Sequence, residues 1–182
     1  MIRFVSGDLF AADCDAIANT VNCVGAMGRG IALGVKTRWP HVYDDYRRDC
    51  GIGRDCAGLI DQRIGPRREQ LAPQCCHPGG TCRVHRVRPG AIIARETGGR
   101  RIRFILEFPT KRHWNATSRL DDVVAGLQPL AETIARLELT SVALPPLGCS
   151  NGGLEWPVVR PLIVSALRNL TTFAINIYGP AT

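Results

Sequence analysis

The stretch that decides the fold is DAIANTVNCVGAMGRG, residues 15–30. Its first part, residues 15–20, is an apolar run of the kind that forms a buried strand. Its last part, residues 23–30, is rich in glycine and leads into apolar residues at helical spacing, which end at Trp39-Pro40. The sequence therefore predicts a strand, a glycine loop and a helix in immediate succession.

A second glycine loop, GCSNGG at residues 148–153, lies between a predicted buried strand at 141–144 and a predicted helix at about 154–170. Glycines let backbone amides approach a ligand closely, and a following helix N-terminus adds partial positive charge, so such a loop can hold a phosphate. Either loop alone could be an ordinary tight turn, because isolated glycine patterns are weak motifs. Two of them at strand ends favour a phosphate-binding site.

The rest of the chain continues the alternation of strands and helices. A helix after Pro40 is predicted to end near Cys50, and Ser118 with Asp121 predicts the start of another helix whose apolar residues recur to Ile134. Further strands are predicted at residues 2–5, 91–96, 102–108 and 173–178. This order predicts an α/β fold, a three-layer α/β/α sandwich with helices on both faces of the sheet.

The composition fits one domain, because 182 residues with 45% hydrophobic content can bury a core without staples. The N-terminal apolar stretch is too short for a secretory signal, and no segment approaches the roughly 18 apolar residues of a membrane span. We therefore expect a cytoplasmic protein that contacts no membrane, and we expect it to be a monomer.

Residues 51–88 lose all periodicity, which indicates a basic surface insertion. The net charge of +7 suits an anionic partner, and we expect the arginines of residues 54–88, with Arg100, Arg101 and Arg103, to help hold nucleic acid. The insertion's possible zinc ligands match no standard finger, which favours reduced thiols over a structural zinc site. They are Cys56, Cys75, Cys76, His77, Cys82 and His85.

Lys111 stands out because Lys36 and Lys111 are the two lysines among 23 lysine and arginine residues. Lys111 lies in FPTKRHW, residues 108–114, directly after a strand-like run. A neutral amine can attack a sugar carbonyl carbon, whereas a guanidinium stays protonated and cannot. Lys111 is therefore the candidate catalytic residue, and Lys36 is interpreted as an ordinary helix residue.

Four segments, in this order, resemble the macrodomain family of ADP-ribose-binding proteins. They are GDLF (7–10), IANTVNCVGAMGRGIAL (17–33), FPTKRHW (108–114) and ALPPLGCSNGGLEW (143–156). The resemblance covers the chain apart from about residues 51–88. It implies a single macrodomain over residues 1–182 with a mixed sheet, which binds ADP-ribose and needs no cofactor. Within the family the chain is similar to the antitoxin branch that removes ADP-ribose from DNA, and next to a branch that acts on protein.

The resemblance assigns roles to individual residues. Asp8 corresponds to the aspartate that accepts from the adenine amino group, and Asn22 to the asparagine that faces the distal ribose. Lys111 corresponds to the catalytic lysine, which engages the anomeric carbon of that ribose. The other ADP-ribose contacts that it implies are Leu9, Gly25, Met27, Gly28, Gly30, Gly148, Cys149, Ser150, Asn151, Gly152, Gly153 and Tyr178.

Several of these residue types also have a plain interpretation. Asp8 could be a turn or cap residue, and Tyr178 could be an ordinary half-buried tyrosine. Asn19 is expected to brace the first loop. Trp114 and Trp156 are interpreted as core or loop anchors.

Three positions depart from the family pattern or leave a role open. The protein-directed branch has an aspartate where this chain has Gly152, which favours DNA as the substrate. Glu107 stands where the DNA-directed branch usually has asparagine, so we expect a carboxylate in the pocket wall. His113, two residues from Lys111, could supply a proton or could be satisfied by the backbone. The second acid or base of the reaction is not identified.

The leading hypothesis is therefore a hydrolase that removes ADP-ribose from DNA bases, of the thymidine type in single strands. One alternative keeps the fold and changes the substrate to an ADP-ribosylated protein carboxylate or O-acetyl-ADP-ribose. Another is a domain that only binds ADP-ribose. Lys111 distinguishes an enzyme from such a reader, since binding needs the loops but not the amine.

Overall fold

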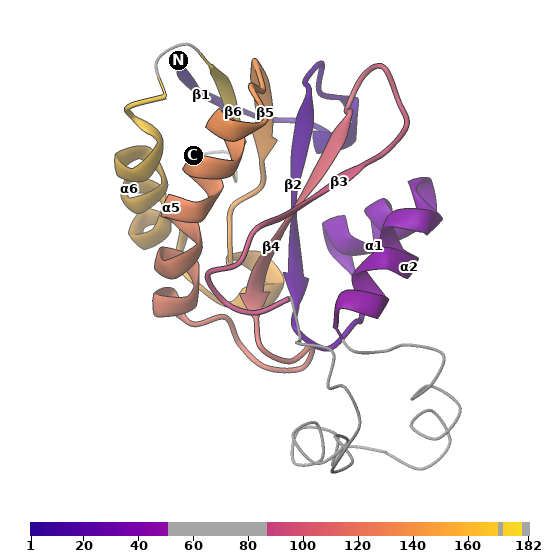
Figure 1. The fold of residues 1–182 in the computed structure, drawn as a ribbon. Helices are drawn as coiled ribbons and strands as arrows, with labels where there is room; N and C mark the ends of the chain where they lie inside the picture. The colour runs from indigo at the N-terminus through magenta and orange to yellow at the C-terminus, as the bar shows by residue number, and fades with distance from the viewer. Residues whose placement is uncertain (51–86, 171–172, 180–182) are drawn as a thin grey trace, which may run out of the picture.

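The computed structural model describes residues 1–50, 87–170 and 173–179 (Figure 1). The strands are β1 (Ile2–Val5), β2 (Ala16–Asn22), β3 (Ile93–Glu96), β4 (Phe104–Lys111), β5 (Ser141–Leu144) and β6 (Ala174–Tyr178). The helices are α1 (Gly30–Arg38), α2 (Pro40–Asp49), α5 (Leu120–Arg136) and α6 (Trp156–Leu167), with short 3-10 helices η1 (Leu9–Ala11) and η3 (Ser150–Gly152).

The six strands form one mixed sheet in the order β1-β6-β5-β2-β4-β3. All neighbours pair in parallel except β3, which runs antiparallel to β4. Figure 1 shows α5 and α6 on one side of the sheet and α1 and α2 on the other. The predicted three-layer sandwich is confirmed, and the strands predicted at residues 91–96 and 102–108 are neighbours in the sheet as β3 and β4.

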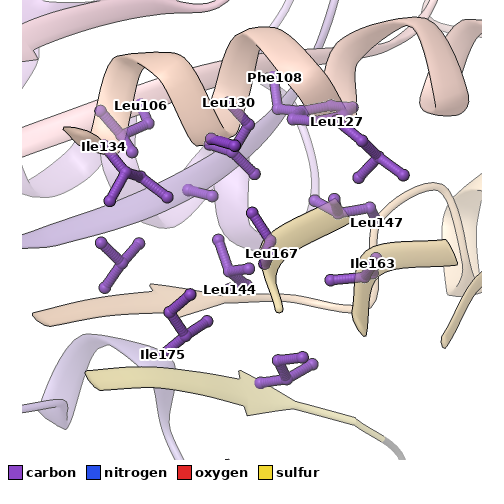
Figure 2. Packing of buried hydrophobic residues seen from close by; sticks show 14 of the residues in the cluster. Leu106, Phe108, Leu127, Leu130, Ile134, Leu144, Leu147, Ile163, Leu167 and Ile175 are labelled. Atoms are coloured by element: carbon purple, nitrogen blue, oxygen red, sulfur yellow. The ribbon is translucent and has the colours of Figure 1, made fainter. Parts of the chain in front are cut away.

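The two faces of the sheet carry separate cores because side chains alternate along each strand. On β2, Ala16 and Ala18 join the core under α5 and α6, whereas Ile17 and Val21 join the core under α1 and α2. Figure 2 shows part of the first core, with Leu130 of α5 among residues of the strands. Since both faces are buried, the central strands read as apolar runs.

The parallel pairing puts the carboxyl ends of β1, β6, β5, β2 and β4 at one edge of the sheet. Both glycine loops follow strands at this edge, the first after β2 and the second after β5. Lys111 is the last residue of β4 and lies at the same edge. Ligands of open α/β sheets bind at this edge.

The start of α5 differs from the sequence prediction. The helix begins at Leu120, and its N-cap is Arg119, which makes no side-chain capping bond. Ser118 is instead buried next to the second loop, where its amide donates to the Gly152 carbonyl oxygen at 2.8 Å. The serine was predicted to cap a helix and in fact ties the α5 entrance to the loop after β5.

Some expectations lie beyond the described residues. The candidate zinc ligands Cys56, Cys75, Cys76, His77, Cys82 and His85 all lie outside the described residues. Within the described ranges, no three His, Cys, Asp or Glu side chains gather as a metal site. In those same ranges no helix is long and apolar enough to cross a bilayer.

We predict that Gly126→Ala destabilises the protein. A Cβ at this position of α5 would lie 2.5 Å from the fully buried Phe108 ring. Helix propensity alone would make the change stabilising by about 1 kcal/mol, but overpacking costs roughly 1–3 kcal/mol. Urea denaturation should therefore show a net loss. Gln128→Ala, an exposed change on the same helix, is the control and should stay within about 0.5 kcal/mol. A stabilised Gly126→Ala would mean that α5 can move away from β4.

Candidate active site

A cavity of about 780 Å³ opens at the carboxyl edge of the sheet. Arg29 and Lys111 are charged residues of its wall, and none of the described residues that line it is a carboxylate. A wall of this kind attracts an anion. The lining consists of residues 20–22, 28–32, 110–111, 145–146 and 148–152, together with Ala26, Trp114 and Asn115.

The first loop is held by Asn22, at the end of β2. Its Oδ1 accepts from the amides of Val24 at 3.0 Å and Ala26 at 3.2 Å, and its Nδ2 donates to the Ala26 carbonyl oxygen at 2.6 Å. The Tyr46 hydroxyl, fully buried on α2, donates to the Asn22 carbonyl oxygen at 2.7 Å. Asn22 also lies in the cavity wall, and its side chain fixes the loop. Tyr46 was not identified from the sequence as a residue that supports this loop, because a tyrosine in a helix is also typical of an apolar core position.

Asn19 and Met27 brace the same loop from below. The Asn19 amide nitrogen lies 4.0 Å from the Met27 sulfur, and both side chains are buried. The expected bracing role of Asn19 is confirmed by this contact. Met27 was expected to contact the ligand, and its side chain is instead in the core because it packs under the loop.

The first turn of α1 faces the cavity with its amides uncapped. The N-cap residue Arg29 makes no side-chain capping bond, and residues 30–32 of the first turn line the cavity. Amides at a helix start have no partner within the helix and carry partial positive charge. The start of α1 is therefore suited to a phosphate oxygen.

The second loop needs its glycines because the surrounding side chains come close. Gly148 has φ +73°, and a Cβ there would lie 2.7 Å from the Leu154 side chain. A Cβ at Gly152 would lie 2.4 Å from the Ser118 hydroxyl oxygen. Gly152 stands where the protein-directed branch has an aspartate. The Ser118 hydroxyl therefore takes up the space that a side chain at this position would need.

The two loops approach each other across the cavity. A Cβ on Gly30 of the first loop would lie 3.3 Å from Nδ2 of Asn151 in the second. A larger residue at position 30 would press on Asn151. The φ of Gly30 is +57°, which glycine adopts more readily than other residues. Backbone groups of both loops can therefore contact one ligand.

Lys111 is aimed by an irregularity in β4. Val21 pairs with Pro109 and Asn22 pairs with Lys111, so Thr110 is an extra residue in β4. Such bulges redirect side chains at strand ends. Both Thr110 and Lys111 line the cavity, and the Lys111 amine donates to the Asn151 carbonyl oxygen at 2.5 Å. The predicted catalytic residue thus joins β4 to the second glycine loop.

Other predicted contacts do not reach the cavity wall. Asp8 accepts from the Phe10 amide at 2.9 Å and caps η1, as its plain interpretation predicted. Leu9 is in the core because it packs under α1 and α2. Gly25 and Gly153 have positive φ and shape the loops. Tyr178 ends β6, beside the end of β1, so Asp8 and Tyr178 remain close to one another at the sheet edge.

Glu107 does not line the cavity, contrary to our expectation. Its side chain is fully buried on the α1/α2 face of the sheet, where it forms an ion pair with Arg95 at 2.9 Å. Arg95 also donates to Asp49 of α2 at 2.8 Å. Alternation along β4 explains the result, because residue 107 falls on the same face as Ile105. Burial raises the pKa of Glu107 to about 7 despite the opposing guanidinium.

His113 and the thiols are not placed for chemistry. His113 is buried outside the cavity wall and its Nδ1 hydrogen-bonds to the Asn115 side chain. Burial raises the pKa of Cys23 to about 11 and also raises that of Cys149. Both thiols are therefore protonated near neutral pH, and Cys149 is the one of the two that lines the cavity.

Two of the arginines expected to bind nucleic acid are at the wrong end of the sheet. Arg101 donates to the Ala12 carbonyl oxygen at 3.1 Å, and Arg103 pairs with Asp15 at 3.1 Å. Both precede β4, whose eight residues separate them from Lys111 by roughly 25 Å at the usual strand rise. They hold the start of β2 and do not border the cavity.

Trp114 is the main surprise in the cavity wall. It was interpreted as an anchor, but 59% of it is exposed, and it lines the cavity. Trp156 is half-buried and packs edge-on against Phe4. No sequence pattern indicates that Trp114 is exposed at the cavity while Trp156 packs against another ring.

Residues 18–163 match the Macro domain family. The chain belongs to the macrodomain family. The DNA ADP-ribosyl glycohydrolase of Mycobacterium tuberculosis is 37% identical over 186 residues, which cover 100% of this chain and 43% of that protein. This chain therefore spans about two fifths of the length of that curated relative.

Solved macrodomains have a similar fold. The macrodomain of Mycobacterium tuberculosis DarG superposes with a TM-score of 0.78 at 37% identity, covering 100% of this chain and 99% of that one. Thermosipho africanus DarTG in complex with ADP-ribose superposes with a TM-score of 0.72 at 26% identity, covering 98% of this chain and 41% of that one. The resemblance inferred from four short segments is confirmed.

We predict that Glu107 makes stability depend on pH. The folded state binds the Glu107 proton more tightly than the unfolded state does, so the contribution of this group falls as pH rises from about 4.5 to about 7. Glu107→Gln removes that titration. The unfolding free energy of the wild type should therefore decline relative to Glu107→Gln across this window, as followed by urea denaturation at a series of pH values. A difference that stays constant with pH would show that Glu107 remains ionised beside Arg95.

Proposed function

We propose that this macrodomain is a hydrolase that removes ADP-ribose from DNA bases, of the thymidine type in single strands. The observation that carries the proposal is the position of Lys111, whose amine lies in the wall of the cavity between two phosphate-type loops. The relatives named for DNA ADP-ribosyl glycohydrolase activity support the choice of DNA.

The geometry suggests how ADP-ribose would bind. The pyrophosphate suits the space between the first turn of α1 and residues 148–152, where backbone amides and Arg29 offer positive charge. Asp8 and Tyr178 lie at the same sheet edge, on the β1 and β6 side, and would contact the adenine. The distal ribose would then lie toward β4, next to Lys111.

Lys111 would act as the nucleophile. A neutral amine can still donate one hydrogen to the Asn151 carbonyl oxygen, which leaves its lone pair directed elsewhere. In the proposed step a bond forms between Nζ and the anomeric carbon while the bond to the base breaks, and the base leaves with the electron pair and takes up a proton. The adduct opens to an imine, and water then releases ADP-ribose and restores the amine.

Gly152 favours a DNA substrate over a protein substrate. The protein-directed branch uses an aspartate at this place to resolve the adduct, and here Ser118 fills the space. A reaction on DNA would proceed without that carboxylate.

Parallel incubations test the substrate. The protein should release free ADP-ribose from an ADP-ribosylated single-stranded oligonucleotide much faster than from an ADP-ribosylated protein carboxylate or O-acetyl-ADP-ribose. Release from the protein or acetyl substrate alone would overturn the DNA assignment. Tight binding of ADP-ribose with release from none of the three would identify a reader.

We predict that Lys111→Ala lowers turnover by at least about a hundredfold and changes ADP-ribose affinity only a few-fold, since the loops bind the ligand without the amine. Lys111→Arg should fail similarly because it keeps the charge and loses the lone pair. Lys36→Ala is the matched control, because Lys36 lies over the Tyr43 ring at 4.4 Å, away from the cavity. Near-normal hydrolysis by Lys111→Arg would show that the lysine serves only as a positive charge.

A further inference from the structure

Trp114 exposes a large aromatic ring at the functional cavity. Among the large hydrophobic residues that are exposed in the described structure, it is the one that also lines the cavity. Exposing an indole costs hydrophobic free energy, and a ring with no packing role in the core is free to contact a ligand. Aromatic side chains at such rims commonly stack on planar groups.

The segment that carries Trp114 is held firmly on both sides. Arg112 makes a two-pronged ion pair with the buried Asp122 of α5, at 3.0 Å and 2.9 Å. The next residue, His113, is buried, and its ring lies 5.4 Å from the indole. The Ala116 amide donates to the His113 carbonyl oxygen at 3.2 Å and closes a turn. The indole is therefore presented on a fixed backbone, which lowers the entropy lost when it binds a ligand.

The position of Trp114 relative to Lys111 tells which part of a substrate would meet it. The two residues are three apart in the chain and line the same cavity. If Lys111 meets the anomeric carbon, whatever is attached to that carbon must leave the cavity beside Lys111. In the binding mode proposed above, the adenine would lie at the opposite side of the site, near the ends of β1 and β6. The indole is thus placed to meet the attached group and not the adenine.

We propose that Trp114 is a positioning residue that stacks on a nucleobase of the ADP-ribosylated DNA strand. The proposal rests on the proposed function, because among the three substrates considered above only DNA supplies an aromatic ring beside the anomeric carbon. Stacking is tolerant of base identity and works on unpaired bases, which fits single-stranded DNA. The Arg112 side chain, next to Trp114, is 57% exposed. Its guanidinium can therefore face a phosphate of the same strand.

The test compares binding of two ligands in a Lys111→Ala background, which prevents turnover. The ligands are free ADP-ribose and an ADP-ribosylated single-stranded oligonucleotide. Adding Trp114→Ala should weaken oligonucleotide binding roughly 5- to 150-fold, the range for losing one base stack, and leave ADP-ribose affinity within about twofold. Adding Trp114→Phe should keep most of the oligonucleotide affinity, because a phenyl ring still stacks.

A matched control separates stacking from general damage. Phe4→Ala removes another exposed aromatic, on β1 and outside the cavity wall, and should leave both affinities unchanged. In otherwise native protein, Trp114→Ala should raise KM for the oligonucleotide and change kcat little. Equal weakening of both ligands, or no weakening of either, would overturn the stacking role.

The same experiment tells the two proposals apart. Absence of oligonucleotide hydrolysis by the wild-type protein would refute the proposed reaction, while the binding comparison would still report on Trp114. Hydrolysis with Trp114→Ala binding the oligonucleotide normally would refute the stacking role and leave the reaction standing.

Discussion

The site depends on the parallel pairing of β2 with β5 on one side and β4 on the other. Because these three strands run in the same direction at the middle of the sheet, the first glycine loop, the second glycine loop and Lys111 all emerge at one edge. Their buried side chains alternate between two cores, which fixes the register, since a slip of one residue would reverse every side chain. The bulge at Thr110 then directs Lys111 into the cavity formed there.

At that edge the groups suited to bind an anion are mostly backbone amides of the two glycine loops, and the surrounding side chains hold these loops in place. The side-chain amide of Asn22 hydrogen-bonds to the backbone of the first loop and fixes its shape. The buried Tyr46 of α2 donates in turn to the Asn22 carbonyl oxygen. The glycines of the second loop let residues of α5 and its entrance, such as Ser118, pack directly behind it. Larger residues at these glycines would clash with their neighbours. The resulting cavity has positive charge and backbone amides that can bind an anion.

The fold and the loops could be predicted because they depend on local patterns. Apolar alternation, glycine before a helix and proline at Trp39-Pro40 each have a direct physical consequence for the backbone. Lys111 could be identified because lysine is otherwise nearly absent. The placement of Glu107 and Trp114 could not be predicted, because burial of a side chain depends on which elements pack against it. Glu107 has an ion-pair partner on β3, whereas no element of the described residues buries the Trp114 ring.

The central claim is that the Lys111 amine forms a covalent bond with the distal ribose. Borohydride reduction during turnover of an ADP-ribosylated oligonucleotide, followed by peptide mass spectrometry, measures this directly, because reduction makes an imine permanent. The account predicts one ADP-ribosyl adduct on the peptide that contains Lys111 and none on the peptide that contains Lys36, the other lysine of the chain. Turnover without any adduct at Lys111, or equal labelling of Lys36, would contradict it.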